Sequence, residues 1–222
     1  MKKITKTNPP PKLTAWRKAN QAANHTYRDL LGTEAYDALK SKLLEEQGWL
    51  CAYTGQSIDS DSSHVEHLKP QCKCAEWEDV EYRNVVACFP ADGGDTSYGY
   101  GAPVKAGWWD EPFFVSPLSA DCERRFRFAW SGHIHPNPND HKAAAKTIKV
   151  LQLDAEALRK LRKARIDGFF GFGRRTRARP LSIADARIAL TNLEYRDGNG
   201  QLKEFCFVLK QLLPKYIEEN SG

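Results

Sequence analysis

HVEHLKP, residues 64–70, places two of the chain's six histidines within four positions, with a glutamate between them. The heptapeptide lies in a segment, residues 49–90, where short apolar runs alternate with polar turns, a texture typical of strands. Neighbouring side chains of a strand point to opposite faces, so Glu66 and His67 can serve one site only where the strand twists or ends. Pro70 follows at once and would end a strand. The stretch therefore predicts a short strand with a candidate site at its end.

Helical patterns surround this β segment. Residues 34–47, EAYDALKSKLLEEQ, repeat apolar residues at helical spacing, with Thr33 as the expected N-cap and Gly48 as the stop. The last third of the chain holds four further helical segments, which we expect to form a bundle around the small β unit, and the first two of them start with a good cap residue. The sequence therefore predicts an α+β fold, with a small β unit embedded in a mainly helical body.

Three regions are expected along the chain. They are an N-terminal arm and helix (1–48), a site-bearing core with a long aromatic loop (49–135), and a C-terminal helical region (136–222). The proline run Pro9–Pro11 predicts an extended arm that docks through Leu13 and Trp16. The loop, residues 91–122, is too irregular for regular elements and too aromatic for a free linker, so we expect it to be packed.

Composition narrows the class of protein. Hydrophobic residues make up 41% and charged residues 27%, the balance of an ordinary folded protein. No apolar stretch reaches the roughly 18 residues of a membrane span, and no apolar run follows the basic N-terminus, so we expect a cytoplasmic protein with no membrane partner. The six cysteines do not form a secreted disulfide pattern. The net charge of +5 fits a polyanionic partner and equally fits a solvated basic surface.

Glu66 and His67 form a pair suited to phosphodiester chemistry. A neutral histidine is a good general base near pH 7. A carboxylate is a good hard ligand for Mg²⁺ or Mn²⁺. His64 is either a supporting ligand or phosphate contact, or a surface or packed histidine outside the chemistry, and we favour the second interpretation.

Three segments together resemble the HNH endonucleases: CAYTG at 51–55, HVEHLKPQ at 64–71 and YRNVVAC at 82–88. The resemblance implies a ββα-metal core in which Glu66 binds the metal and His67 is the general base that activates water. Asn84 looks like the middle Asn of that family, which orients the catalytic histidine and its loop. The implied activity is cleavage of nucleic acid, expected to be DNA, with Mg²⁺ or Mn²⁺ as the cofactor.

The chain departs from the family pattern in two places. Where the family carries a third His or Asn, this sequence has Asp92 and Asp95, and we expect Asp92 to be the second metal ligand. Many relatives also bind structural zinc through Cys-x-x-Cys pairs, whereas here the first pair would be Cys51 and Thr54. A threonine cannot replace a thiolate ligand, which argues against a four-cysteine zinc site.

Further segments are similar to PtuB, the HNH subunit of Septu-type anti-phage systems, which is also found attached to some retrons. They are LTAWR at 13–17, LLEEQGWLCAYTG at 43–55, FVSPLSADCERRFRF at 114–128, SGHI at 131–134, and TIKVLQLD with LRKLRKARID between 147 and 167. The similarity implies an effector nuclease that works beside an ATPase partner of the PtuA type, in some cases within a retron assembly.

Basic residues supply candidates for nucleic-acid binding, although such residues are common on any surface. The candidates are Lys69, Lys105, Arg124, Arg125 and Arg127. The tract GFFGFGRRTRARP, residues 168–180, suits stacking and backbone contact with nucleic acid, but a helix end docked on the core or on a partner explains it slightly better.

Two other function classes stay open. The first is a binding module, in which a degenerate ββα unit recognises DNA or holds a structural metal without catalysis. The missing third ligand and the broken cysteine pair favour it. The second is an interaction subunit whose aromatic segment, Tyr98–Phe114, seats a partner, in which case large exposed aromatic surface is expected.

Overall fold

Two short antiparallel strands carry the first four residues of the heptapeptide and the apolar run VVAC. The computed structural model describes residues 1–20, 26–172 and 179–221. Strand β1 (His64–His67) pairs with β2 (Val85–Cys88), so that His64 lies opposite Cys88 and His67 opposite Val85. All four residues of β2 are buried, whereas burial alternates along β1. The short strand predicted from the sequence is thus present and ends before Pro70.

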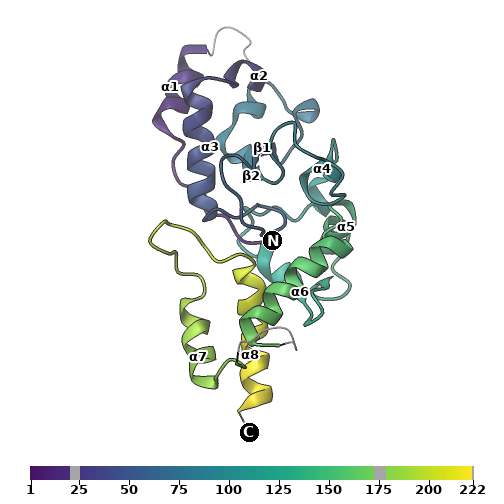
Figure 1. Ribbon diagram of the computed structural model, residues 1–222. Coiled ribbons are helices and arrows are strands. Elements are labelled where there is room, and N and C mark those ends of the chain that lie inside the picture. Colours follow the sequence, from purple (N-terminus) through teal and green to yellow (C-terminus); the bar gives the residue numbers. More distant parts are fainter. Residues whose placement is uncertain (21–25, 173–178, 222) are drawn as a thin grey trace.

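Helix α3 (Glu34–Gln47) covers one side of this hairpin (Figure 1). The Thr33 side chain accepts a hydrogen bond from the Tyr36 backbone N–H, and Gly48 ends the helix in the left-handed conformation. Both ends agree with the sequence-based expectation. The buried Gln47 clamps the free edge of β2: its amide donates to the Ala87 carbonyl at 2.8 Å and accepts from the Ala87 N–H at 2.7 Å.

The N-terminal region is more helical than expected. Helix α1 (Pro11–Asn20) begins within the proline run, because a proline at the first helical position lacks only an N–H that would have no helical partner. The prediction of an extended arm is therefore wrong from Pro11 onward. Leu13 is fully buried and Trp16 packs against the core, so both anchor the segment as expected. The single turn α2 (Tyr27–Leu30) follows.

The segment after β2 lacks a long helix. Residues 91–101 form turns, and the helical turn α4 has only four residues, Ala102–Lys105. The rest of the loop is packed, as expected: Phe114 is buried and its ring contacts those of Tyr53, Trp108 and Trp109. Of its aromatic side chains, Tyr98 and Phe113 are the exposed ones, at 44% and 38%.

A second small hairpin and four helices complete the fold. They are β3 (Phe126–Phe128), β4 (Ile134–Pro136), α5 (Lys142–Val150), α6 (Glu156–Phe170), α7 (Ile183–Asn192) and α8 (Cys206–Asn220). Gln211 of α8 bonds the backbone of β3 much as Gln47 bonds β2, accepting from Phe128 N–H at 2.7 Å and donating to the Phe126 carbonyl at 2.9 Å. Helices α7 and α8 pack together at the end of the molecule away from β1 (Figure 1).

The described helices and strands confirm an α+β fold of small sheets in a mainly helical body. Between the helices, single 3-10 turns occur at Gln71–Lys73, Glu78–Val80, Tyr82–Asn84, Glu111–Phe113 and Cys122–Arg125. In residues 1–20, 26–172 and 179–221 we find no helix whose length and apolar character would let it cross a membrane.

Candidate functional site

The alternation of β1 divides the heptapeptide between two faces. His64 and Glu66 share one face and are partly exposed, whereas Val65 and His67 share the other and are buried. Glu66 and His67, the expected pair, therefore lie on opposite faces of the strand.

The contacts of His67 define which ring nitrogen can accept a proton. Its Nε2 lies 2.8 Å from the backbone carbonyl oxygen of Asp79. A carbonyl oxygen only accepts, so Nε2 carries the hydrogen and the lone pair of the neutral ring is on Nδ1. Nδ1 lies a long 3.5 Å from the Gln71 amide nitrogen. Burial lowers the pKa of His67, and the hydrogen bond with Asp79 and the Glu66 charge offset this only in part. His67 is consequently a neutral imidazole near pH 7, with Nδ1 ready to accept a proton.

Glu66 is an ionised carboxylate held by three side chains. Lys105 Nζ lies 3.0 Å from Oε1 and the Tyr53 hydroxyl donates to the same oxygen at 3.4 Å. His64 Nε2 lies 3.5 Å from Oε2. Burial alone would raise the pKa of Glu66, but the hydrogen bond from His64 and the Lys105 ammonium outweigh it and lower the pKa.

His64 is anchored at both ring nitrogens, because its Nδ1 lies 2.5 Å from the carbonyl oxygen of Pro90. Burial lowers the pKa of His64, yet its hydrogen bonds with Glu66 and Pro90 exceed that effect and raise it overall. The ring lines a pocket of about 190 Å³ together with Asp92 and residues of the following turn. The structure therefore places His64 beside the carboxylate, although the sequence favoured a packed histidine outside the site.

Asn84 fastens the loop between the strands. Its Oδ1 accepts from the Lys69 N–H at 2.8 Å, and its Nδ2 donates to the carbonyls of Lys69 and Glu78, each at 3.1 Å. The loop between these two residues includes Gln71 and adjoins Asp79, whose polar atoms contact the two ring nitrogens of His67. Asn84 thus bonds both ends of the loop that carries Gln71.

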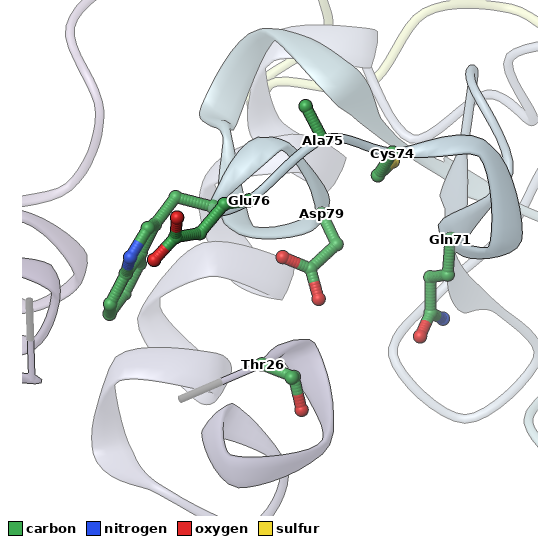
Figure 2. A pocket seen from close by; sticks show the side chains of 7 residues that line it. Thr26, Gln71, Cys74, Ala75, Glu76 and Asp79 are labelled. Carbon is green, nitrogen blue, oxygen red and sulfur yellow. The ribbon is translucent and has the colours of Figure 1, made fainter. Parts of the chain in front are cut away.

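A pocket of about 270 Å³ is lined by residues of this loop, among them Gln71 and Asp79, and by Thr26 (Figure 2). Figure 2 shows the side chains of Gln71 and Asp79 extending from the loop toward Thr26. The Asp79 carboxylate accepts from the Tyr27 N–H at 2.7 Å and so joins α2 to the loop. Gln71 therefore both lines this pocket and contacts Nδ1 of His67.

Asp92 and Asp95, the two acids at the third position of the motif, have different surroundings. Asp92 accepts from the Tyr36 hydroxyl at 3.0 Å, and its charge acts with that of Glu66 on both His64 and Tyr27. Asp95 instead caps its own turn by accepting from the Ser97 N–H and hydroxyl. Asp92 is therefore the acid that shares surroundings with Glu66.

The donor set is compatible with a hard divalent ion. Across the described ranges 1–20, 26–172 and 179–221, no group of three or more His, Cys, Asp or Glu side chains is arranged to hold a metal. Mg²⁺ keeps several waters and uses only one or two carboxylates, so Glu66 with Asp92 fits that ion better than a closed zinc cage. Cys51 is buried and hydrogen-bonded to Cys88 and Thr54.

The candidate phosphate-binding residues are spread over several elements. Lys105 is 2% exposed and its ammonium also donates to the His67 carbonyl at 2.7 Å, so it lies inside the site and not on the surface. Lys69 pairs with Glu78 at 2.5 Å, and Arg125 with Asp121 at 2.6 Å. Arg124 and Arg127 are exposed, next to and on β3.

The tract 168–180 is described only in part, because residues 173–178 lie outside the described residues. Phe170 is fully buried against Trp130 and Tyr216, as expected for a helix end docked on the core. Sequence reasoning missed Tyr27, Tyr36 and Gln71. Gln71 directly follows HVEHLKP and could have been included, whereas the tyrosines lie about 30 to 40 residues away with no local signal.

Comparison with known proteins adds one distant relative. No protein-family model matches the chain. The chain is 25% identical over 181 residues to a protein of Vibrio cholerae serotype O1 biovar El Tor named "Retron Vc95 putative HNH endonuclease". The alignment covers 78% of this chain and 80% of that protein. The similarity extends well beyond the heptapeptide and includes most of both chains.

Proposed function

We propose that this protein is a metal-dependent endonuclease of the HNH type. The observation that carries the proposal is the state of His67: a buried, neutral imidazole whose Nε2–H is held by the Asp79 carbonyl and whose Nδ1 keeps its lone pair, 3.5 Å from the Gln71 amide nitrogen. Beside it on the same strand lies an ionised glutamate. The name of the Vibrio cholerae relative supports the same reaction class.

In the proposed reaction His67 Nδ1 accepts a proton from the attacking water. The water oxygen forms a bond to phosphorus while the bond from phosphorus to the leaving oxygen breaks. The hydrogen bond from Nε2 to Asp79 persists throughout and keeps the ring from rotating. Asn84 holds the loop that supplies this carbonyl, so its role is to position the base.

Glu66 and Asp92 are the proposed ligands of Mg²⁺ or Mn²⁺. A divalent ion held there would offset the negative charge that builds on the phosphate oxygens during cleavage. Lys105 already pairs with Oε1 of Glu66, so an ion would bind at Oε2 and replace its 3.5 Å contact with His64. We therefore propose that Lys105 is the counter-ion of Glu66 and not a contact of the nucleic-acid backbone.

The proposed biological setting is an anti-phage complex. The Septu-like segments of the sequence and the retron context in the relative's name support an effector that acts on nucleic acid, with DNA as our proposed target. An ATPase partner of the PtuA type is proposed on the sequence resemblance alone. Exposed Arg124 and Arg127 are proposed backbone contacts.

The proposal is tested with the purified full-length chain and three substrates: supercoiled plasmid, circular single-stranded DNA and RNA. Each is incubated with Mg²⁺, with Mn²⁺, or with EDTA. We expect nicking of plasmid in either metal and none in EDTA. Cleavage that persists in EDTA contradicts the metal requirement. Absence of cleavage of every substrate, with and without an ATPase partner, contradicts the nuclease.

One observation favours a second candidate, a binding module that performs no catalysis. Both carboxylate oxygens of Glu66 already contact basic side chains, so the site is electrically balanced without an ion. Such a module would shift DNA in a gel equally well with Mg²⁺ or EDTA and would never nick it.

A further inference from the structure

Two tyrosines from the N-terminal helices enter the site, and neither belongs to the segments that carry the motif. Tyr27, the first residue of α2, is 7% exposed, and its ring centroid lies 4.5 Å from that of His67 with the planes at 84°. Tyr36, in the first turn of α3, donates its hydroxyl hydrogen to Asp92 Oδ2 at 3.0 Å. One tyrosine therefore contacts the proposed base and the other contacts a proposed metal ligand.

The two tyrosines also contact each other. Their rings lie edge to face, with centroids 6.2 Å apart and planes at 68°. Because a carboxylate only accepts, the Tyr36 hydroxyl hydrogen is committed to Asp92. Burial raises the pKa of both hydroxyls, that of Tyr36 to about 12, so both stay protonated at physiological pH. Ring contacts therefore join His67 to Tyr27 and Tyr27 to Tyr36, and a hydrogen bond joins Tyr36 to Asp92.

Asp92 depends more than Glu66 does on a hydrogen-bond donor that holds its carboxylate in place. Glu66 projects from a paired strand and has three side-chain partners. Asp92 lies in a turn closed by the hydrogen bond from Gly94 N–H to the Ala91 carbonyl, with no helix or strand to fix it. Two carboxylates that approach one ion also repel each other until it binds. A donor that holds the carboxylate in place before the ion arrives therefore strengthens binding.

We propose that Tyr27 and Tyr36 are positioning residues of the nuclease site: Tyr36 orients Asp92 toward the divalent ion, and Tyr27 links that hydrogen bond to the ring of His67. The inference rests on the proposed function, because it takes Asp92 as a ligand and His67 as the base. It also gives α2 and α3 a function beyond packing, since they hold together two parts of the site that the sequence separates by 25 residues.

The test measures Mn²⁺ affinity in the absence of nucleic acid, from the electron paramagnetic resonance signal of free Mn²⁺. Tyr36→Phe removes one oxygen and keeps the ring, and we expect it to weaken Mn²⁺ binding by about 10-fold or more. Asp92→Asn and the double variant complete a cycle, in which the Tyr36 effect should vanish once Asp92 is changed. Tyr27→Phe keeps the contact with His67 and should lose less affinity. Tyr195→Phe, at a side chain 69% exposed, is the matched control.

Several outcomes separate this inference from the proposed function, given melting curves that show folded variants. The inference is overturned if Tyr36→Phe binds Mn²⁺ within twofold of the wild-type affinity, or if its effect adds fully to that of Asp92→Asn. In either case the proposed nuclease function would still hold if the wild-type protein nicks plasmid. Failure of the wild type to bind Mn²⁺ also overturns it. If the wild type binds Mn²⁺ with the expected Tyr36 dependence but cleaves nothing, the positioning role holds and the proposed function fails.

Discussion

Lys105 Nζ lies 3.0 Å from Glu66 Oε1 and 2.7 Å from the carbonyl oxygen of His67, with the lysine only 2% exposed. The same ammonium thus contacts both residues of the expected catalytic pair. A buried cation is costly unless it is paired, so this lysine and Glu66 stabilise each other's charged forms. The hydrogen bond from His64 and this pairing together lower the pKa of Glu66, although burial acts in the opposite direction.

Lys105→Met is therefore expected to lower the melting temperature. Removal of one partner of a buried pair costs about 3 kcal/mol, or roughly 6–12 °C for a chain of this size. Mn²⁺ should restore part of the loss, because it supplies the missing positive charge beside Glu66. The measurement is thermal unfolding with and without Mn²⁺. Lys160→Met, at an exposed pair with Glu156, is the control and should change little. An unchanged melting temperature for Lys105→Met contradicts the pairing.

Asn84→Asp is expected to loosen the loop that positions His67. Aspartate has nearly the same shape but cannot donate to the carbonyls of Lys69 and Glu78, so two hydrogen bonds are lost and a charge is buried. Amide hydrogen exchange across residues 69–80 should accelerate, and nicking should fall by about 100-fold. Asn139→Asp, at an exposed side chain bonded to Arg127, serves as the control. Wild-type protection of the loop in Asn84→Asp would show that the asparagine does not hold it.

Lys6 makes the stability of the fold depend on pH. Its side chain is 2% exposed, and its ammonium lies 4.0 Å from Glu46. Burial lowers its pKa from 10.5 to about 7, and the charge of Arg83 acts in the same direction, although Glu46 acts in the opposite one. Nζ also lies 4.1 Å from the centroid of the Tyr82 ring. Between these two pH values the unfolded chain binds more protons than the folded one at this residue. This group's contribution to stability therefore rises with pH.

Lys6→Met removes that dependence, so it should raise the melting temperature at pH 7 by more than at pH 9.5. The quantity to compare is the difference in melting temperature between the variant and the wild type at each pH, because other groups titrate equally in both proteins. Lys12→Met, at an exposed pair with Glu34, should show no such change of difference with pH. Equal differences for Lys6→Met at the two pH values would contradict the lowered pKa.

Local sequence signals predicted the elements that local interactions determine. Thr33 and Gly48 bound α3 because a cap and a left-handed glycine act within one turn. The strand of HVEHLKP ends before Pro70 because proline lacks a donor for pairing. The prediction of an extended arm fails because proline disrupts the interior of a helix but suits its first position, where Pro11 lies.

The site was only partly predictable for a different reason. Glu66, His67 and Asn84 stand in a recognisable order, and the structure brings the last two together through the loop that Asn84 holds. Lys105 looked like a surface cation, since nothing in its neighbourhood reports that the chain folds it against Glu66, 39 residues earlier. Tyr27 and Tyr36 likewise reach the site only through the packing of α2 and α3 near the hairpin.

The most direct test of the account is Mg²⁺-dependent plasmid nicking by His67→Ala, compared with His135→Ala in the second hairpin and with wild type. Melting curves and DNA-binding gels verify that each variant folds and binds. The account predicts that His67→Ala binds DNA but nicks it at least about 100-fold more slowly, because no group remains to accept the proton of water, while His135→Ala nicks as wild type does. A folded His67→Ala protein with wild-type nicking would contradict the central claim.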